Sequence, residues 1–166
     1  MSNRSQSITA ILTKAVLDHR LVPGCKLGER ELSEIFGTSR IVIRQALIRL
    51  ADDGLATIER NRGAFVAKPG MQEAIELYDA LTLVEQGVAA QLSERLGPAG
   101  WNELRQHVER QRQAVEAGND ALADLLGQEY HTLFVRLSRN KVMQDIHAQL
   151  IRRTTLLRSL IPADFE

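Results

Sequence analysis

Hydrophobic residues in the first fifty positions recur every three or four residues, in three separate segments. This spacing predicts helices with one apolar face from Ser7 to about Leu21, from Glu29 to Phe36, and from the Thr38-Ser39 pair to about Asp52. The predicted inward side chains of the three helices are Ile8, Ile11, Leu12, Ala15, Val16 and Leu17; Leu32, Ile35 and Phe36; and Val42, Ile43, Ala46, Leu47 and Leu50.

Residues that favour helix ends and turns separate these segments. Ser7 is the predicted N-cap of the first helix, and Thr38 or Ser39 that of the third, because short hydroxyl side chains accept hydrogen bonds from helix N-termini. Pro23-Gly24 predicts a turn, and Gly37 is expected to end the second helix in the left-handed conformation.

The helical spacing stops at Gly54 and gives way to short β-type runs. Leu55 to Glu59 and Ala64 to Ala67 predict two strands, and the intervening Arg60-Asn61-Arg62-Gly63 is typical of a hairpin. Helix, helix, turn, helix and hairpin in this order predict a winged helix-turn-helix.

Everything beyond Pro69-Gly70 has helical spacing. The predicted helices lie at about 72–96, 98–118, 121–138 and 140–160. The first of them carries an apolar stripe that comprises Ile75, Tyr78, Leu81, Val84 and Val88. The sequence therefore predicts a mainly α protein with two domains, a winged helix at 1–69 and a helical bundle at 70–166.

Composition and charge narrow the class of protein. Hydrophobic residues make up 44% of the 166 positions, and no apolar run is long enough to cross a bilayer or to act as a signal peptide. The single cysteine, Cys25, excludes an intrachain disulfide and is expected to be a half-buried filler beside a turn. These features predict a cytoplasmic protein. Residues 1–70 hold 11 basic and 7 acidic side chains, and this excess fits a polyanionic partner.

The third helix is the predicted recognition element, because in a helix-turn-helix the start of the second helix of the pair enters the major groove. Arg40, Arg44 and Ile41 are expected to project outward, and an arginine fork matches the acceptors of guanine or bridges phosphate oxygens. Arg30 is placed to contact the DNA backbone or a base, and Arg62 at the hairpin tip is placed to contact the minor groove or a phosphate. The alternative interpretation is a solvated helix face and a polar turn. No catalytic arrangement is present in the sequence, so an enzyme is not expected.

Many residues across 7–68 resemble the DNA-binding domain of the GntR family. The matching stretches are Pro23-Gly24, Leu27-Gly28-Glu29-Arg30-Glu31-Leu32-Ser33-Glu34, Gly37-Thr38-Ser39-Arg40, Val42-Ile43-Arg44-Gln45-Ala46-Leu47, Leu50, Gly54-Leu55 and Arg62-Gly63-Ala64-Phe65-Val66. By resemblance, the positions that contact DNA are Arg30, Ser39, Arg40, Ile41, Val42, Arg44 and Gly63. The family usually has proline at Val42 and glutamate at Gln45, which could shift the preferred half-site.

The second half resembles the FCD effector domain of the FadR branch of that family, on Leu83-Val84-Glu85, Ala89-Ala90, Tyr130-His131 and Asn140. Such domains pair subunits and hold a small carboxylate, often beside a divalent metal ligated by an aspartate and three histidines. His131 falls on the first histidine ligand, but Gly127 replaces the aspartate and Leu81 replaces the arginine that faces the effector. A packing role is expected for His131, and His107 and His147 have no partner at ligand spacing.

The FCD resemblance also implies that the bundle is incomplete at its C-terminus, with an apolar face that another copy of the chain could cover. That face comprises Leu150, Ile151, Leu156, Leu157, Leu160 and Ile161. The sequence therefore predicts a homodimeric transcription regulator, a repressor modulated by a small organic acid, that binds a palindromic site in double-stranded DNA. The alternative is a helical dimerisation or ligand-binding protein whose winged helix does not bind DNA.

Overall fold

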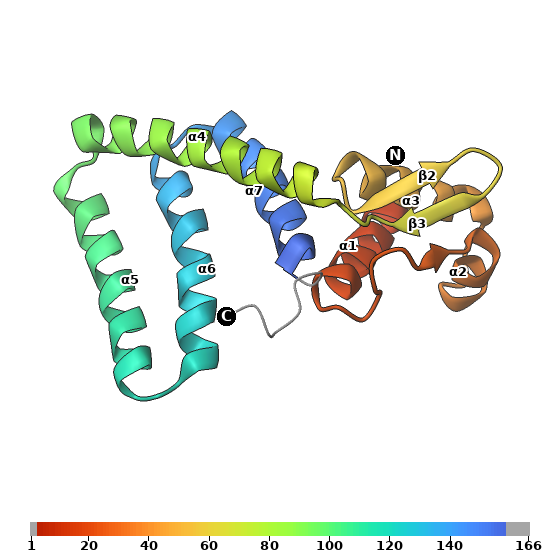
Figure 1. Ribbon diagram of the computed structural model, residues 1–166, viewed down its shortest axis with the longest axis horizontal. Coiled ribbons are helices and arrows are strands. Elements are labelled where there is room, and N and C mark those ends of the chain that lie inside the picture. Colours follow the sequence, from red (N-terminus) through yellow and green to blue (C-terminus); the bar gives the residue numbers. More distant parts are fainter. Residues whose placement is uncertain (1–2, 159–166) are drawn as a thin grey trace. The chain divides into compact units, whose positions relative to one another are not determined.

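The computed structural model describes residues 3–158, and within them the chain forms seven helices and three strands (Figure 1). In chain order these are α1 (Asn3–Leu17), β1 (Lys26–Leu27), α2 (Glu29–Ile35), α3 (Arg40–Asp52), β2 (Ala56–Glu59), β3 (Gly63–Val66), α4 (Met71–Arg95), α5 (Pro98–Glu116), α6 (Asp120–Leu137) and α7 (Lys141–Arg158). The mainly α fold with a winged helix-turn-helix is confirmed.

The described residues form two compact units. The winged-helix unit comprises the residues up to Tyr78 together with those from Ile151 onward, and the helical unit comprises Asp79–Leu150. The C-terminal turns of α7 therefore belong to the first unit, although the sequence pattern predicts them as part of the bundle that begins near residue 70.

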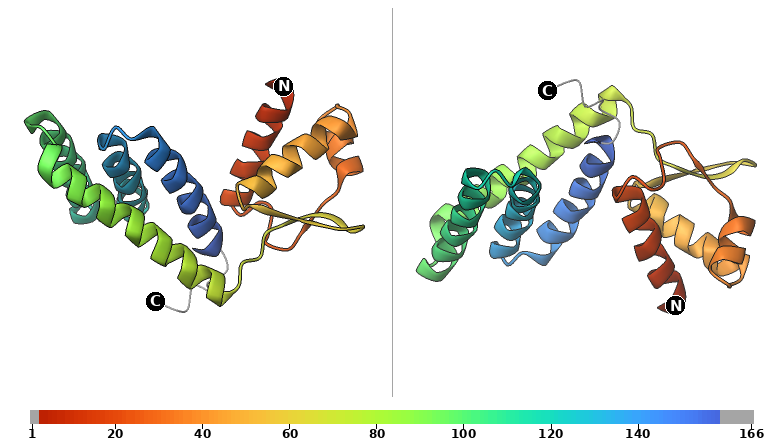
Figure 2. Two further views of the ribbon diagram at one scale, coloured as in Figure 1. Left: turned by 90° about the horizontal axis from the view of Figure 1, so that it is seen from above. Right: turned by 90° about the horizontal axis from the view of Figure 1, so that it is seen from below.

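A three-stranded antiparallel sheet in the order β1-β3-β2 forms the wing side of the first unit. The register pairs Thr57 with Phe65 and Lys26 with Phe65 on the two edges of β3. The β2–β3 hairpin projects beyond the helices of this unit (Figure 2). The sequence did not predict β1, because two residues are too short to show an alternation of hydrophobic and polar positions.

One apolar core holds the winged-helix unit together. Its fully buried large side chains come from α1, from α3 and from the strands or the loops beside them, and one comes from α7; they are Val16, Ile43, Leu47, Leu50, Leu55, Val66 and Leu156. Since burial of each such side chain contributes roughly 1.5–3 kcal/mol, this core is the main source of stability of the unit.

Three details of the first helices differ from the prediction. Ile11 of α1 is 54% exposed, because Ile8, Leu12 and Val16 form the line of this helix that packs on the core and Ile11 lies beside that line. The helix α1 begins at Asn3, so Ser7 lies inside it and is not its N-cap. The side chain of Ile35 is 73% exposed, because the short α2 packs on the core through Leu32 and Phe36, which lie one turn apart. Ile35 lies beside that line and not on it.

The predicted turns are present at the start of α3 and after it. Gly37 has a φ of 55° and ends α2 in the left-handed conformation, as expected. Ser39 caps α3, since its side chain accepts a hydrogen bond from the amide of Val42 at 3.4 Å. Gly54, with a φ of 73°, ends the same helix and turns the chain into β2.

In the helical unit, α5 and α6 lie side by side and are joined by a short turn (Figure 1). Gly118 has a φ of 66°, and the Asn119 side chain caps α6 by accepting from the amide of Leu122 at 3.2 Å. His107 is buried, and its Nε2 lies 2.7 Å from the carbonyl oxygen of Leu126, so it joins α5 to α6.

Parts of the predicted apolar faces lie elsewhere than expected. Ile75 and Tyr78 of α4 are exposed, whereas Leu81 and Val88 are buried. The face that was expected to be uncovered at the end of the chain is largely closed, because Leu156 and Leu157 are 1% and 5% exposed. Leu160 and Ile161 lie outside the described residues. None of the helices that the structure describes is long and apolar enough to span a membrane.

Candidate nucleic-acid interface

The side chains of α3 divide sharply between the core and the solvent. Ile43 and Leu47 are buried, whereas Arg40 and Arg44 are exposed. Ile41, next to Arg40 in the sequence, is 70% exposed. Val42 is half-buried against the core, so only part of its side chain is accessible. The helix therefore presents two cations and one exposed apolar side chain next to its capped N-terminus.

Arg44 is held by the first residue of α2. Its Nε and Nη2 atoms each donate a hydrogen bond of 2.7 Å to the two carboxylate oxygens of Glu29. Hydrogen bonds from this guanidinium lower the pKa of Glu29 and stabilise its ionised form. A two-bond fork fixes the plane of a guanidinium better than a single contact does. Arg44 is nevertheless 64% exposed, so its outer edge stays accessible.

The other two predicted arginines of the helix-turn-helix are less constrained. Arg30 lies 3.4 Å from the carboxylate of Glu31, and both side chains are exposed. Within residues 3–158, Arg40 makes no hydrogen bond or ion pair with a side chain, although its charge acts on Glu29. Both guanidinium groups are therefore available to an anionic ligand.

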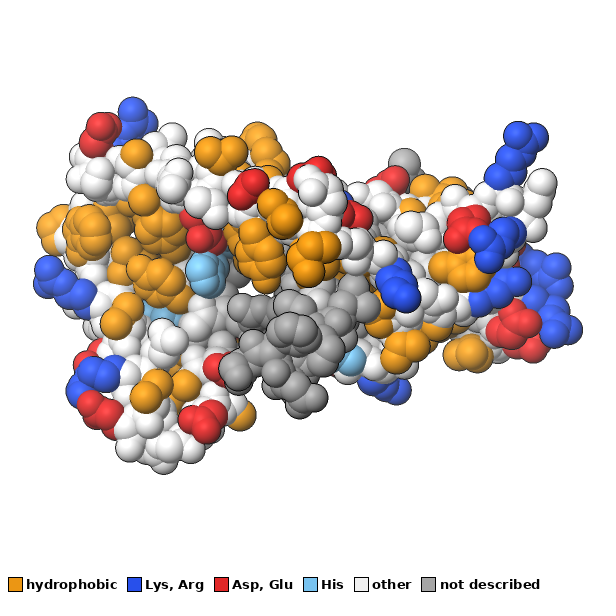
Figure 3. All heavy atoms as spheres, viewed as in Figure 1, with side chains coloured by type: hydrophobic (Ala, Val, Ile, Leu, Met, Phe, Trp, Pro, Cys, Tyr) orange, Lys and Arg blue, Asp and Glu red, His pale blue; other side chains and the backbone are white. Residues whose placement is uncertain are grey.

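The wing carries two more exposed arginines at its tip, Arg60 and Arg62. Arg62 donates a hydrogen bond to Glu59, and its guanidinium carbon lies 5.3 Å from the centre of the Phe65 ring. Gly63 adopts a φ of 99°, which a side chain would strain, and so allows the tight hairpin. Figure 3 shows Lys and Arg side chains gathered at the end of this unit where α2 and the wing tip lie, with acidic groups among them.

Arg4 supports the turn before α3, a role that sequence reasoning missed. Its Nη2 donates to the backbone oxygens of Phe36 and Gly37 at 3.0 and 2.8 Å. These residues are more than thirty positions away from Arg4, and no local pattern links them to it. Carbonyl groups at the end of α2 lack partners within the helix, so an arginine here satisfies them.

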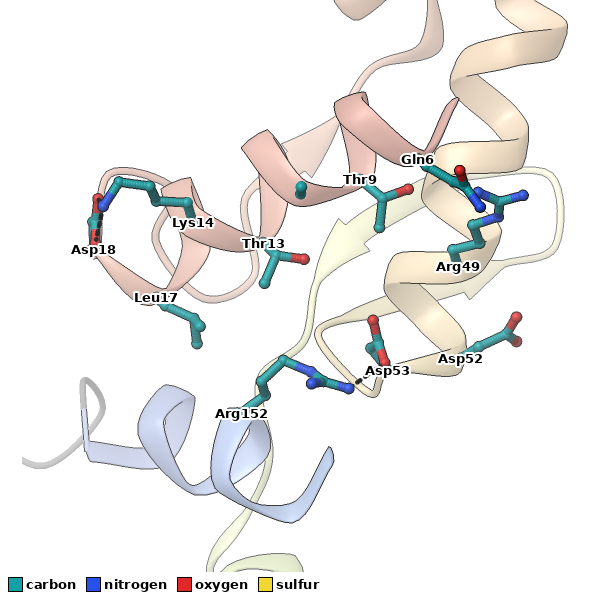
Figure 4. Close-up of a pocket in the computed structure, with 11 residues that line it drawn as sticks. Gln6, Thr9, Thr13, Lys14, Leu17, Asp18, Arg49, Asp52, Asp53 and Arg152 are labelled. Atoms are coloured by element: carbon teal, nitrogen blue, oxygen red, sulfur yellow. Dashed lines mark hydrogen bonds and ion pairs between the residues drawn. The ribbon is translucent and has the colours of Figure 1, made fainter. Parts of the chain in front are cut away.

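A second charged region of the unit has a different character. A cleft lies between α1, α3 and the last turns of α7, and Figure 4 shows Arg152 aimed at Asp53, with an Nη2-to-oxygen distance of 2.6 Å. Its charged lining residues are balanced in sign: Lys14, Arg49 and Arg152 against Asp18, Asp52 and Asp53. A polyanion gains little from such a lining, so the arginines near the wing form the candidate interface.

The helical unit brings together one carboxylate and two histidines that are far apart in the sequence. Oε1 of Glu85 lies 2.8 Å from Nδ1 of His131 and 3.0 Å from Nε2 of His147. Burial opposes ionisation of Glu85, but the hydrogen bonds from both histidines outweigh it and lower its pKa to about 2. The sequence offers His147 no partner at ligand spacing, and the side chain that it contacts in the structure, Glu85, lies on another helix.

These three residues do not fit the divalent metal that the FCD resemblance implies. Each histidine directs one ring nitrogen at the same carboxylate oxygen, and a nitrogen that donates a hydrogen has no lone pair for a metal. Gly127 provides no ligand one turn before His131. Among the described residues no group of three His, Cys, Asp or Glu is arranged to hold a metal ion.

The fold and the arginine-bearing helix define a class, the winged helix-turn-helix proteins with an appended helical domain. Two family models match the chain: "Bacterial regulatory proteins, gntR family" at residues 4–66 and "FCD domain" at residues 76–166. The chain therefore belongs to the GntR family of bacterial regulatory proteins, in the branch that carries an FCD domain.

The chain is also similar to individual known proteins whose names are consistent with this family. The chain is 29% identical over 143 residues to the HTH-type transcriptional repressor RspR of Escherichia coli K12, an alignment that covers 85% of the chain and 62% of RspR. Its fold resembles that of a GntR transcriptional regulator from Rhodococcus sp. RHA1, with a TM-score of 0.78, 21% identity and coverage of 98% and 77%. It also resembles McbR/YncC of Escherichia coli, with a TM-score of 0.69, 22% identity and coverage of 99% and 80%.

Proposed function

We propose that this protein binds duplex DNA in a sequence-dependent manner and regulates transcription, with α3 in the major groove and the wing on the adjacent backbone. The observation that carries the proposal is the exposed side of α3 near its N-terminus, which carries Arg40, Ile41 and Arg44. The proposed contact residues are Arg30, Ser39, Arg40, Ile41, Val42, Arg44, Arg62 and Gly63.

Each part of this surface has a distinct role in the proposal. Arg40 and Arg44 donate to base edges, where an arginine fork matches O6 and N7 of guanine. Ser39 lies at the N-terminus of α3, whose free amides and positive dipole end hold a phosphate. Arg30, near the start of α2, holds a phosphate through the charge of its guanidinium. Arg62 reaches a phosphate or the minor groove from the wing, and Gly63 lets the backbone approach closely.

The protein acts as a homodimer on a palindromic site in this proposal. Two copies would place two recognition helices about 34–36 Å apart, one turn of DNA, which matches a two-fold operator. The proposal is supported by exposed apolar side chains on the helical unit, which include Leu83 at 70% and Val142 at 67% exposure. Surfaces of this kind are typical of subunit contacts. Sedimentation at micromolar concentration tests the oligomeric state.

The direction and control of regulation are also proposed. RspR is named a repressor, and we propose repression here, since a dimer seated on a promoter excludes other proteins. A small organic acid that binds the helical unit would modulate the affinity, and calorimetry with a panel of carboxylates tests for it. Such a protein would act in the cytoplasm, where bacterial DNA lies.

The deciding experiment is selection of bound sequences from a random duplex pool, followed by affinity measurements on the selected duplex. Arg40→Ala and Arg44→Ala should each weaken binding by about 1–3 kcal/mol and relax sequence preference. Arg105→Ala, a change at an exposed arginine of α5, is the matched control and should have no effect. If the unaltered protein shows no preference among duplexes at low salt, the proposed function is wrong.

A further inference from the structure

The Glu29–Arg44 pair occupies one edge of the guanidinium and leaves the other open. Glu29 accepts from Nε and Nη2, so both N–H groups of Nη1 and the second N–H of Nη2 have no part in the fork. An arginine can meet two acceptors through either edge. With the Nε edge occupied, only the end formed by Nη1 and Nη2 is available to a ligand.

We propose that Glu29 is a positioning residue that sets the sequence discrimination of the protein by presenting Arg44 to DNA end-on. This inference rests on the proposed function. It differs from that function because Glu29 itself does not contact DNA and carries the wrong charge to attract it. Glu29 influences DNA binding only by orienting Arg44.

Rigidity is the first physical reason. A free arginine side chain has several rotatable bonds, and ordering it on binding costs conformational entropy. The fork joins the first residue of α2 to the second turn of α3, two helices that pack on each other. Arg44 is therefore already oriented before DNA binds. It can donate hydrogen bonds only to base pairs whose acceptors face Nη1 and Nη2.

Charge is the second reason. Affinity for any duplex rises with the number of phosphates that cations neutralise, and this gain is independent of sequence. The Glu29 carboxylate offsets part of the charge of Arg44 and also acts on Arg40. It should therefore lower the general attraction to every duplex while leaving the directed hydrogen bonds of Arg44 in place. Discrimination then depends on the orientation of Arg44, which raises the ratio between specific and non-specific binding, and the reduced charge keeps binding to unrelated DNA weak.

The test uses the full chain and two duplexes, one selected from a random pool and one with the same composition in shuffled order. Glu29→Gln removes the charge and weakens the fork. We expect it to lower the ratio of affinities for the two duplexes by about tenfold, with affinity for the shuffled duplex unchanged or higher. Glu34→Gln removes the same charge from an exposed position of α2 and should leave the ratio unchanged.

A double variant separates positioning from general damage to the fold. If Glu29 acts through Arg44, then Glu29→Gln combined with Arg44→Ala should give the same ratio as Arg44→Ala alone. A signal of the Arg44 Nε–H in NMR spectra of the free protein should be sharp and slow to exchange, and it should broaden or vanish in Glu29→Gln.

Each outcome has one meaning. Equal loss of affinity for both duplexes in Glu29→Gln, or an unchanged ratio, overturns the positioning role while the proposed function stands. Additive effects in the double variant overturn it as well. If the unaltered protein shows no preference for the selected duplex, the proposed function is wrong. The positioning role of Glu29 is then wrong as well, whatever the NMR signal shows.

Discussion

The carboxylate of Glu85 on α4 accepts a hydrogen bond from Nε2 of His147, 62 residues further along the chain on α7. His147 is 2% exposed, and His131 of α6 donates to the same oxygen atom. The three side chains thus link three helices of the helical unit through one carboxylate. A half-buried carboxylate with two donors stabilises the unit through these hydrogen bonds while it is ionised.

Acid should therefore weaken the helical unit by way of Glu85. Its pKa is lowered from 4.5 to about 2 in the folded protein, so its contribution is full above pH 4.5 and is lost as the pH falls toward 2. Glu85→Gln should cost about 2 kcal/mol of unfolding free energy at pH 7. The stability curves of variant and unaltered protein should converge near pH 2 in urea unfolding. Glu94→Gln, an exposed change on the same helix, is the control; parallel curves would contradict the role of Glu85.

Divalent metal should not stabilise the protein. His131 and His147 already direct ring nitrogens at Glu85, and Gly127 supplies no ligand. We expect the melting temperature to stay within error after treatment with EDTA and after addition of Zn²⁺, Ni²⁺ or Mn²⁺ at a small excess. A bound metal would raise the melting temperature by mass action, so a metal-dependent rise would show that the ligand set was misjudged.

Truncation of Leu156 should destabilise the winged-helix unit. This α7 side chain is 1% exposed in the same core as Ile43 and Leu50 of α3. Leu156→Ala should cost about 2–5 kcal/mol, because the lost burial adds to the cost of a cavity. Amide exchange in α1 and α3 should accelerate. Lys141→Ala changes a 78% exposed side chain of the same helix and should cost under about 0.5 kcal/mol. If amide exchange in α3 is unchanged in Leu156→Ala, Leu156 does not stabilise this core.

Substitution of Gly54 should strain the turn after α3. Its φ of 73° disfavours an L side chain, and an added Cβ would lie 2.7 Å from Cδ of Arg153. Gly54→Ala should cost at least about 1–2 kcal/mol of stability for the left-handed conformation alone. Gly70→Ala, where no atom lies within 4 Å of the added carbon, is the control in thermal unfolding. Equal melting temperatures for the two variants would contradict the strain.

The wing should contribute affinity without sequence preference. Arg62→Ala should weaken binding to selected and shuffled duplexes by similar factors. If Arg62 contacts one phosphate, the slope of log affinity against log salt should fall by about 1. Fluorescence anisotropy across a salt series measures both quantities, with Arg105→Ala as the control. A loss confined to the selected duplex would instead assign a base contact to Arg62.

Sequence patterns predicted most of the elements, because local rules decide them. The hairpin, the four later helices and the turns at Gly37 and Gly54 follow from periodicity and from backbone preferences that act over a few residues. The same rules failed for Ser7 and Ile35, where packing against distant residues decides helix length and exposure. The exposure of Arg40 and Arg44 was also predictable, since the apolar stripe of α3 identifies the positions that are buried and leaves these two outside it.

The amino-acid sequence by itself determined the winged helix, the helical domain after it and the cations of α3, since helical periodicity and arginine placement are properties of neighbouring residues. Only the tertiary structure decided that Glu29 accepts hydrogen bonds from Arg44, that Arg4 donates to the α2–α3 turn, and that Glu85 accepts from two histidines. Those contacts join residues 15 to 62 positions apart, and their distances depend on how the helices pack.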